Sequence, residues 1–152
     1  MNEKKFKSLQ ELLDFVLKEC GEMEWNIHHN NNQLRITKGF NLERIYYALY
    51  LSEKLKGIKI PRLDIWQLNL IDIDLEGGWF EKMNTLKVLN CYDNQLTRLP
   101  KLPPHLELLD CHNNNITYLT KEILTIKNVS CYDNPIYKEL LKQKYFIKKY
   151  DN

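Results

Sequence analysis

Glycine and long apolar runs are scarce in this sequence of 152 residues, and each scarcity excludes a class of protein. With only five glycines, the chain has neither a glycine-rich loop for a phosphate group nor a nucleophile elbow. No stretch reaches the roughly eighteen consecutive apolar residues that a membrane-spanning helix requires. We therefore expect a soluble cytoplasmic protein, or one in a host cytosol in the case of an effector or viral protein, with no membrane partner.

An excess of charge of one sign is also missing. The chain has 22 lysines and arginines against 20 aspartates and glutamates, a formal net charge of +2. This balance lacks the basic footprint of a nucleic-acid-binding protein, so nucleic acid is not the expected partner. The lysines between Lys138 and Lys149 are interpreted as the solvated face of a terminal helix, the alternative being contact with nucleic acid or acidic lipid.

Cysteine and histidine are few, and their spacing does not predict a catalytic or metal site. His28 and His29 are adjacent, so on a strand they face opposite ways, and His105 follows two prolines in a loop. Three of the four cysteines recur at steps of twenty residues, which spreads them along a line, whereas zinc ligands must converge on one point. We expect reduced thiols, no metal, no cofactor, no catalytic residues and no enzymatic activity.

The C-terminal half contains an internal repeat with a step of twenty residues. The segments that begin at Leu86, Leu106 and Ile126 align without gaps, and the tetrapeptide Cys-Tyr-Asp-Asn occurs in the first and the third. Apolar residues occupy the first, fourth and eleventh positions of every copy. Cysteine always holds the sixth position and asparagine the ninth, which gives Cys91, Cys111, Cys131, Asn94, Asn114 and Asn134. Five matching columns in three copies make chance a poor explanation.

A fourth, degenerate copy is predicted to begin at Ile65, one step of twenty-one residues before the next copy. This register places Leu68, Leu70 and Leu75 in the apolar columns, and it puts Ile73 at the ninth position instead of asparagine. A first repeat is often atypical because only one of its sides contacts another repeat.

The repeat columns resemble the leucine-rich-repeat family, whose core pattern is L-x-x-L-x-L-x-x-N-x-L. The stretch LTRLPKLPPHLELLDCHNNNITYL is similar to the short LPxLP-type subtype of bacterial and giant-virus repeats, in which paired Leu-Pro steps alternate with a strand. The resemblance covers Ile65 to about Leu140, roughly half of the chain. It implies an α/β fold class, a short solenoid with a parallel sheet of about four strands, in which the asparagines satisfy buried backbone groups. It also implies a binding function, which most members of the family have.

The flanking segments predict caps at both ends of the repeats. Residues 1–60 are expected to form an α+β cap of helix, hairpin and helix, with the helices over 7–20 and 41–56, where apolar residues recur at helical spacing. The repeats are expected to occupy residues 61–137, and residues 138–152 to form a C-terminal capping helix, all within one cooperative domain. Without that helix, the last strand would expose apolar side chains and unpaired backbone groups.

The hairpin is predicted from alternating apolar and polar residues in the segment 25–36, around the polar turn Asn30–Asn32. Trp25 and Ile27 would lie on one strand, and Leu34 and Ile36 on the other. The alternative is a further decayed repeat, in which Ile27, Asn32 and Leu34 align with Leu109, Asn114 and Ile116.

If the fourth and sixth residues of each copy face inward on a strand, the third, fifth and seventh face outward. The outward residues form columns across the sheet, with the eighth residues beside them. The third column is Gln67, Val88, Leu108 and Asn128, the fifth Asn69, Asn90, Asp110 and Ser130, the seventh Ile71, Tyr92, His112 and Tyr132, and the eighth Asp72, Asp93, Asn113 and Asp133. We expect the rings of Tyr92, His112 and Tyr132 to stand in a row beside an acidic row.

The predicted functional site is a partner-binding patch on these columns. Tyrosine is common at binding hot spots because it offers a large area with a polar tip at a modest loss of entropy. We expect the partner to be another protein with a basic or mixed aliphatic surface; the simpler interpretation is a soluble sheet face with no partner. The patch consists of Val88, Asn90, Tyr92, Asp93, Leu108, Asp110, His112, Tyr132 and Asp133.

Two alternatives place chemistry in the chain. The first is an effector or enzyme whose active residues lie in residues 1–60, where no geometry can be assigned from the sequence. The second is a fragment related to bacterial ubiquitin ligases, because Cys91-Tyr92-Asp93 and Cys131-Tyr132-Asp133 match their Cys-x-Asp motif. An active-site cysteine must be exposed and thiolate-prone. Since these thiols fall at inward positions, we interpret the match as accidental.

Overall fold

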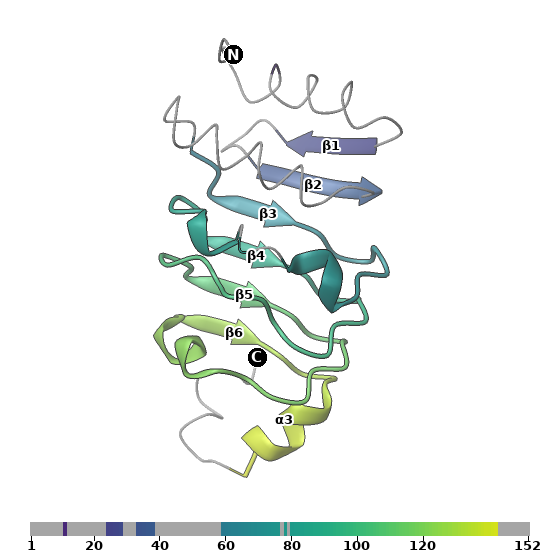
Figure 1. Cartoon of the computed structure of the whole chain (residues 1–152), viewed down its shortest axis with the longest axis vertical. Helices are drawn as coiled ribbons and strands as arrows, with labels where there is room; N and C mark the ends of the chain where they lie inside the picture. Colours follow the sequence, from purple (N-terminus) through teal and green to yellow (C-terminus); the bar gives the residue numbers. More distant parts are fainter. Residues whose placement is uncertain are drawn as a thin grey trace.

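The computed structural model describes residues 11, 24–28, 33–38, 59–76, 78 and 80–142. The described strands form one six-stranded sheet and lie side by side in the order of the sequence (Figure 1). β1 and β2 are antiparallel, and every later pair is parallel. The strands are β1 (Glu24–His28), β2 (Gln33–Lys38), β3 (Arg62–Asp64), β4 (Val88–Asn90), β5 (Leu108–Asp110) and β6 (Asn128–Ser130).

The hairpin predicted in the segment 25–36 is confirmed. β1 and β2 pair with Trp25 opposite Ile36 and with Ile27 opposite Leu34. The alternative, a further decayed repeat, is wrong for this segment because a repeat contributes one parallel strand and not an antiparallel pair. β2 then pairs in parallel with β3, so the hairpin continues the sheet of the repeats.

The three regular repeats stack in the register that the sequence predicted. Leu89 lies opposite Leu109, and Leu109 lies opposite Val129. Each three-residue strand is followed by a turn and then by a return segment that leads to the next strand. The return after β4 is free of helix and rich in proline, whereas the return after β5 contains the 3-10 helix η3 (Lys121–Thr125).

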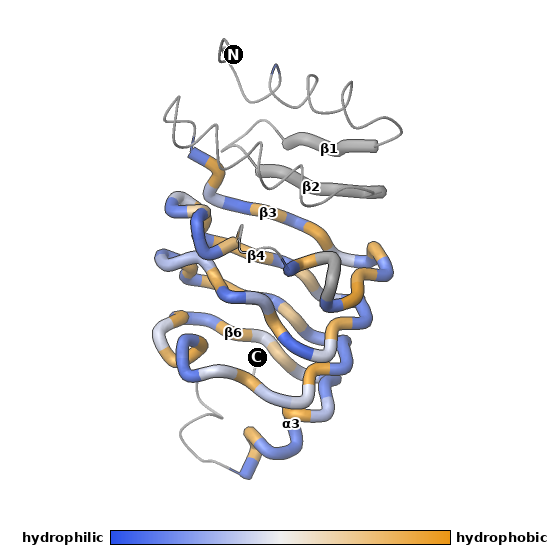
Figure 2. Tube along the Cα trace, viewed as in Figure 1, coloured by the Kyte–Doolittle hydropathy of each residue, from blue (hydrophilic) through white to orange (hydrophobic). Residues whose placement is uncertain are grey.

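The core extends through all the repeats because the same positions of each repeat are buried. The first position is buried in every regular repeat, the eleventh is buried in two of them and half-buried at Ile136, and the fourth and sixth are completely inaccessible to solvent, as predicted. Figure 2 shows the result as apolar segments that alternate with polar ones from one repeat to the next. The inaccessible residues of the regular repeats are Leu89, Cys91, Leu109, Cys111, Val129 and Cys131.

The first repeat does not have the predicted register. Leu63, in β3, lies opposite Leu89, so the step to the next repeat is twenty-six residues instead of twenty-one. This repeat therefore begins near Ile60, which is buried like the first residues of the other repeats, and not at Ile65. Its longer return segment holds the 3-10 helices η1 (Asp72–Leu75) and η2 (Phe80–Lys82).

The prediction failed here because the return segment of the first repeat is itself apolar. Leu70 and Leu75 are buried, but they reach the core from the return and not from a strand. Leu68 follows the turn, and its backbone N–H donates to the Asn94 side chain at 3.0 Å. A pattern of apolar residues fits both registers, and only the pairing of β3 with β4 distinguishes them.

A short helix, α3 (Pro135–Leu140), follows the last strand. It begins three residues before the predicted boundary at 138, because proline is tolerated in the first turn of a helix, where no N–H is needed. Leu140 is buried, and Ile136 and Tyr137 pack against the core, so α3 covers the core of the last repeat. Residues 143–152 lie outside the described residues.

The helices predicted nearer the N-terminus are hardly described. Of the helix expected over 7–20, only Glu11 is described, and it is helical; the helix expected over 41–56 lies outside the described residues. Among the described residues, none of the helices has the length and apolarity to cross a bilayer.

A ladder of side-chain hydrogen bonds joins the repeats at the ninth-position asparagines, all of which are buried. The Asn114 amide donates to the carbonyl of Cys111 in its own repeat at 3.0 Å and to that of Cys91 in the preceding repeat at 3.1 Å. Its side-chain oxygen accepts from the N–H of Leu96 at 3.0 Å. The other two ninth-position asparagines make equivalent contacts. Each amide therefore satisfies buried backbone groups of two successive repeats.

Asn114→Ala is expected to lower the free energy of unfolding by about 2 to 3 kcal/mol, because the buried N–H of Leu96 loses its acceptor. Urea unfolding followed by circular dichroism measures the change. The neighbouring Asn115 is exposed, so Asn115→Ala is the control and should change stability by less than about 0.5 kcal/mol. Equal losses in the two variants would contradict a structural role for the ladder.

Candidate functional site

The outward side of the sheet, formed by the third, fifth, seventh and eighth residues of the repeats, is called the strand face. Four aromatic rings form a continuous stack along it. The ring centroids of Trp66 and Tyr92 lie 5.3 Å apart, those of Tyr92 and His112 4.6 Å, and those of His112 and Tyr132 4.3 Å. Neighbouring ring planes are within 12° of parallel. Because each ring follows its strand by two residues, the strand spacing of about 4.8 Å sets the ring spacing. The expected row of three rings is present, and Trp66 extends it.

Because the register of the first repeat differs from the prediction, four other residues of this repeat occupy the outward columns of the strand face. Trp66 takes the place expected for Ile71, which lies beyond the turn and is 48% exposed. Sequence reasoning missed Trp66 because the predicted register made it the residue before the strand. In the third, fifth and eighth columns, the places expected for Gln67, Asn69 and Asp72 belong to Arg62, Asp64 and Gln67.

Asp72 lies in the return segment and joins it to the next repeat. Its carboxylate accepts from the backbone N–H of Thr97 at 2.7 Å and of Arg98 at 3.3 Å, and from the Thr97 hydroxyl. Burial raises the pKa of Asp72, but these hydrogen bonds and the charge of Arg98 together hold it below its usual value. Asp72 is therefore an ionised structural residue and not part of an acidic row on the face.

The eighth-position residues form a hydrogen-bonded row rather than a purely acidic one. Gln67, Asp93, Asn113 and Asp133 all have positive φ, between 52° and 56°. Asparagine and aspartate tolerate this conformation better than most residues. The Asp93 carboxylate accepts from the Gln67 amide at 3.1 Å and from the Asn113 amide at 2.7 Å. The negative charge of Asp93 is thus partly compensated by hydrogen bonds within the protein.

The fifth-position residues are more buried than the sequence predicted. Asn90 and Ser130 were expected to face water, yet each is only 8% exposed, and Asp64 in the same column is 4% exposed. Short side chains on a sheet are shielded when larger side chains flank them on the same strand and on the next. Asp64 accepts from the Asn90 amide at 2.6 Å and pairs with Arg62 at 3.1 Å.

Asp110 holds the imidazole of His112 in the stack. The carboxylate contacts Nδ1 of His112 and also accepts from the His112 backbone N–H at 3.3 Å. The imidazole is therefore fixed in orientation between the rings of Tyr92 and Tyr132.

The accessible parts of the face lie beside and at the end of the stack. Val88 and Leu108, in the third column, are half-buried and present aliphatic surface next to the rings. Tyr132 is 36% exposed. Burial and the carboxylates of Asp110, Asp133 and Asp93 raise the pKa of Tyr132, so its hydroxyl stays protonated. The face offers aliphatic side chains, ring edges and hydroxyls, which suit recognition of a surface.

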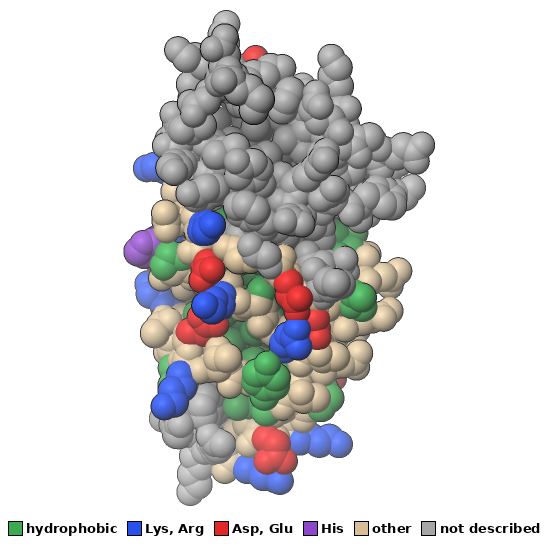
Figure 3. Space-filling view, in the orientation of Figure 1, with side chains coloured by type: hydrophobic (Ala, Val, Ile, Leu, Met, Phe, Trp, Pro, Cys, Tyr) green, Lys and Arg blue, Asp and Glu red, His purple; other side chains and the backbone are tan. Residues whose placement is uncertain are grey.

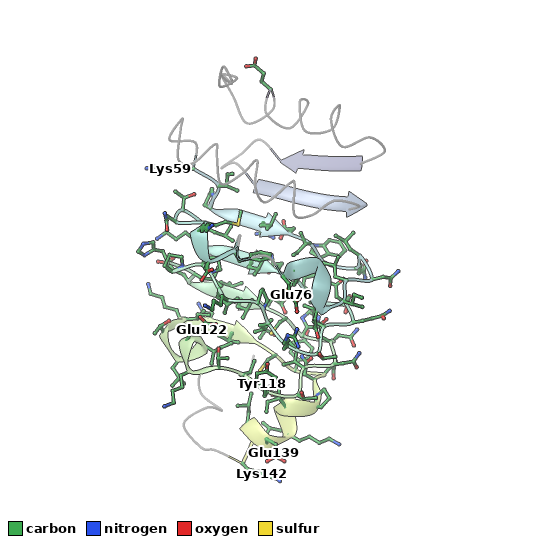
Figure 4. The ribbon with its side chains drawn as sticks, viewed as in Figure 1. Lys59, Glu76, Tyr118, Glu122, Glu139 and Lys142 are labelled. Atoms are coloured by element: carbon green, nitrogen blue, oxygen red, sulfur yellow. The ribbon has the colours of Figure 1, made fainter. Side chains whose placement is uncertain are left out.

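The return segments on the other side of the sheet carry mixed charge. Figure 3 shows acidic and basic side chains next to one another there, and Figure 4 labels Glu76 and Glu122 among them. Glu76 pairs with Arg98, and Glu81 with Lys101 at 3.9 Å, beside a hollow of about 280 Å³. Exposed ion pairs of this kind add little stability. This side has the character of an ordinary solvated surface.

The sixth-position thiols are free, buried and poorly nucleophilic. Burial raises the pKa of Cys91 to about 12 and that of Cys131 to about 11. Burial and the neighbouring thiols also raise the pKa of Cys111. Because the thiolate is the reactive form, these cysteines lack the property that an active-site cysteine needs. Among the described residues, no three histidine, cysteine, aspartate or glutamate side chains are grouped to hold a metal ion.

Comparison of the chain with protein-family models, with curated proteins and with solved structures found no match.

The three repeat cysteines are expected to resist a chromogenic thiol reagent at pH 8 in the folded protein and to react fully in denaturant, because burial keeps them protonated. Absorbance measures the reacted thiols. Cys20 lies outside the described residues, so the experiment uses Cys20→Ser. Fast modification of any thiol of that variant in the native state would contradict the burial.

The raised pKa values also predict a loss of stability at alkaline pH. Thiols of the unfolded chain ionise near the ordinary pKa of 9.0, whereas in the folded chain burial raises the pKa of Cys91 to about 12 and that of Cys131 to about 11. The stabilisation is therefore complete below pH 9 and is lost as pH rises toward the folded values. Urea unfolding between pH 9 and 11 should show a smaller pH slope for Cys91→Ala, by about 1.4 kcal/mol per pH unit. Equal slopes would contradict the prediction.

Proposed function

We propose that this chain is a short leucine-rich-repeat solenoid that binds another protein on its strand face and has no catalytic role. The sequence columns that resemble the family occupy corresponding places in the stacked repeats. The cap segments on either side of the repeats would protect the two ends of the core. The N-terminal cap is proposed for residues 1–60, and the C-terminal cap for the segment that starts with α3.

The observation that carries the proposal is the stack of four rings. Stacked rings held at the strand spacing lose little further freedom when a partner binds, so the surface is preorganised. Aromatic residues with polar tips are the side chains that most often dominate a protein interface.

The chemistry of the face favours a mixed aliphatic partner surface at its centre. Val88 and Leu108 offer apolar area, while the central carboxylates are already paired within the protein. Asp93 lies between two amides, and Asp110 contacts His112. Attraction for a basic group is therefore concentrated at Asp133, whose carboxylate has no partner among the described residues.

The test is Leu108→Glu, which places a charge at the centre of the face. The partner is captured from cell extract by affinity and quantified by mass spectrometry. The amount of a specific partner captured is expected to be at least tenfold lower than with wild type, because an unpaired carboxylate would be buried at the interface. The matched control is Leu124→Glu, which introduces the same charge at an exposed leucine in η3. Thermal unfolding of both variants verifies that they fold.

A partner captured equally well by wild type and both glutamate variants would contradict the strand face as the binding surface. Retention by Leu108→Glu together with loss through changes in residues 1–60 would move the site to the N-terminal region.

A further inference from the structure

The regular repeats are joined by backbone hydrogen bonds that extend beyond their three-residue strands. The N–H groups of the sixth and eighth residues donate to the carbonyls of the fifth and seventh residues of the next repeat. Cys111 donates to Ser130 at 2.9 Å, and Asn113 donates to Tyr132 at 3.0 Å. The preceding repeat makes the same two bonds, at 2.8 and 3.1 Å.

At the last repeat, the equivalent donors have no acceptor among the described residues. The N–H groups of Cys131 and Asp133 make no hydrogen bond within the described part of the chain. α3 buries Leu140 against the core, yet it supplies no carbonyl to either N–H. Against the described part of the chain, β6 therefore presents an open backbone edge, which is a template for a further strand.

Two side-chain rows end at the same place. Tyr132 is the last ring of the stack: His112 covers one face, and no described residue places a ring on the other. Asp133 is exposed, and no described residue pairs with its carboxylate, in contrast to Asp93 between its two amides. Among the described residues, none supplies a planar group or an N–H donor one strand spacing beyond β6.

We infer that the edge of β6 accepts a parallel strand from a partner protein, and that this strand carries an arginine opposite Tyr132. Two carbonyls of the added strand accept the N–H groups of Cys131 and Asp133, as in the interior repeats. The guanidinium lies flat on the free face of Tyr132 and donates to the Asp133 carboxylate. The arginine side chain then extends both the stack of rings and the row of eighth-position hydrogen bonds.

Arginine fits this end better than the other candidates. Lysine has a compact ammonium without the planar face that would continue the stack. Pairing with the β6 edge of a second copy would bring two Asp133 carboxylates together with no donor between them. The carboxylates of Asp110 and Asp133 near Tyr132 give this end the opposite charge to an arginine-bearing strand.

This edge is distinct from the centre of the strand face, although both belong to the proposed binding function. Edge binding requires the donors of Cys131 and Asp133 and does not require Leu108. The variant Leu108→Glu should therefore bind an edge peptide within about twofold of wild type, since its side chain does not contact the added strand. Failure of the strand-face proposal and failure of the edge proposal are thus distinguishable.

The probe is the synthetic peptide LKVSNSRNN. It copies residues 86–94, with arginine at the seventh position, asparagine at the eighth, and serine at the two inward positions. Titration into the nitrogen-15-labelled full chain, followed by NMR, is expected to shift the amide signals of Cys131 and Asp133 and to slow their hydrogen exchange. A peptide of the same residues in scrambled order should cause no protection.

Substitutions on the protein test the side-chain part of the inference. Asp133→Asn should weaken peptide binding about tenfold, because it removes a charge-assisted hydrogen bond while asparagine tolerates the positive φ. The matched control Asp93→Asn removes the same charge from the same repeat position and should bind within about twofold. Tyr132→Phe keeps the ring face and the affinity, whereas Tyr132→Leu should lose about tenfold.

Several results would overturn the inference. An arginine-to-lysine change in the peptide that leaves the affinity unchanged would exclude the stacked guanidinium. Protection confined to residues away from β6 would exclude strand addition at this edge. Sedimentation that shows a dimer of wild type and a monomer of Asp133→Asn would identify a second copy as the occupant.

Discussion

The hydrogen bonds of the ninth-position asparagines are the constraint on which the rest of the described structure depends. A chain that turns sharply after a three-residue strand leaves backbone N–H and C=O groups inside the protein, where each costs free energy unless it is paired. Asparagine meets both needs, because its amide donates and accepts. Asn114 ties its own turn to the repeat before it, and so fixes how the two repeats stack. Stacking, in turn, places every other column.

The strand face follows from that stacking. Once neighbouring strands are held at the sheet spacing, a residue at the seventh position of every repeat lies directly over its equivalents, and planar side chains there must stack. Trp66, Tyr92, His112 and Tyr132 meet this condition. The next residue of every repeat has a positive φ, and in this column the Asp93 carboxylate accepts from the Gln67 and Asn113 amides. The same stacking of the repeats that forms the core therefore also aligns the residues of the proposed binding surface.

A repeat at either end of such a stack has a neighbouring repeat on one side only, whereas a repeat in the middle has one on both sides. An interior repeat has its backbone donors, rings and polar side chains satisfied by the next repeat, while the repeat of β6 is the last one within the described residues. α3 covers the apolar side chains at this end, because it buries Leu140 against the core. Within the described residues, the backbone N–H groups of Cys131 and Asp133 and one face of the Tyr132 ring are left without partners, and the proposed strand addition at β6 rests on this difference.

The sequence alone determined the regular repeats, the hairpin and three of the four stacked rings, because columns of identical residues report positions with identical surroundings. Cysteine at the sixth position and asparagine at the ninth left one register for β4, β5 and β6. Tertiary structure alone decided the first repeat, where Leu68, Leu70 and Leu75 imitate a strand pattern from within a return segment. It also decided the burial of Asn90 and the pairing of Asp93, since both depend on neighbours from other strands. Periodicity records which side chains avoid water, and only the packed chain determines which groups they meet.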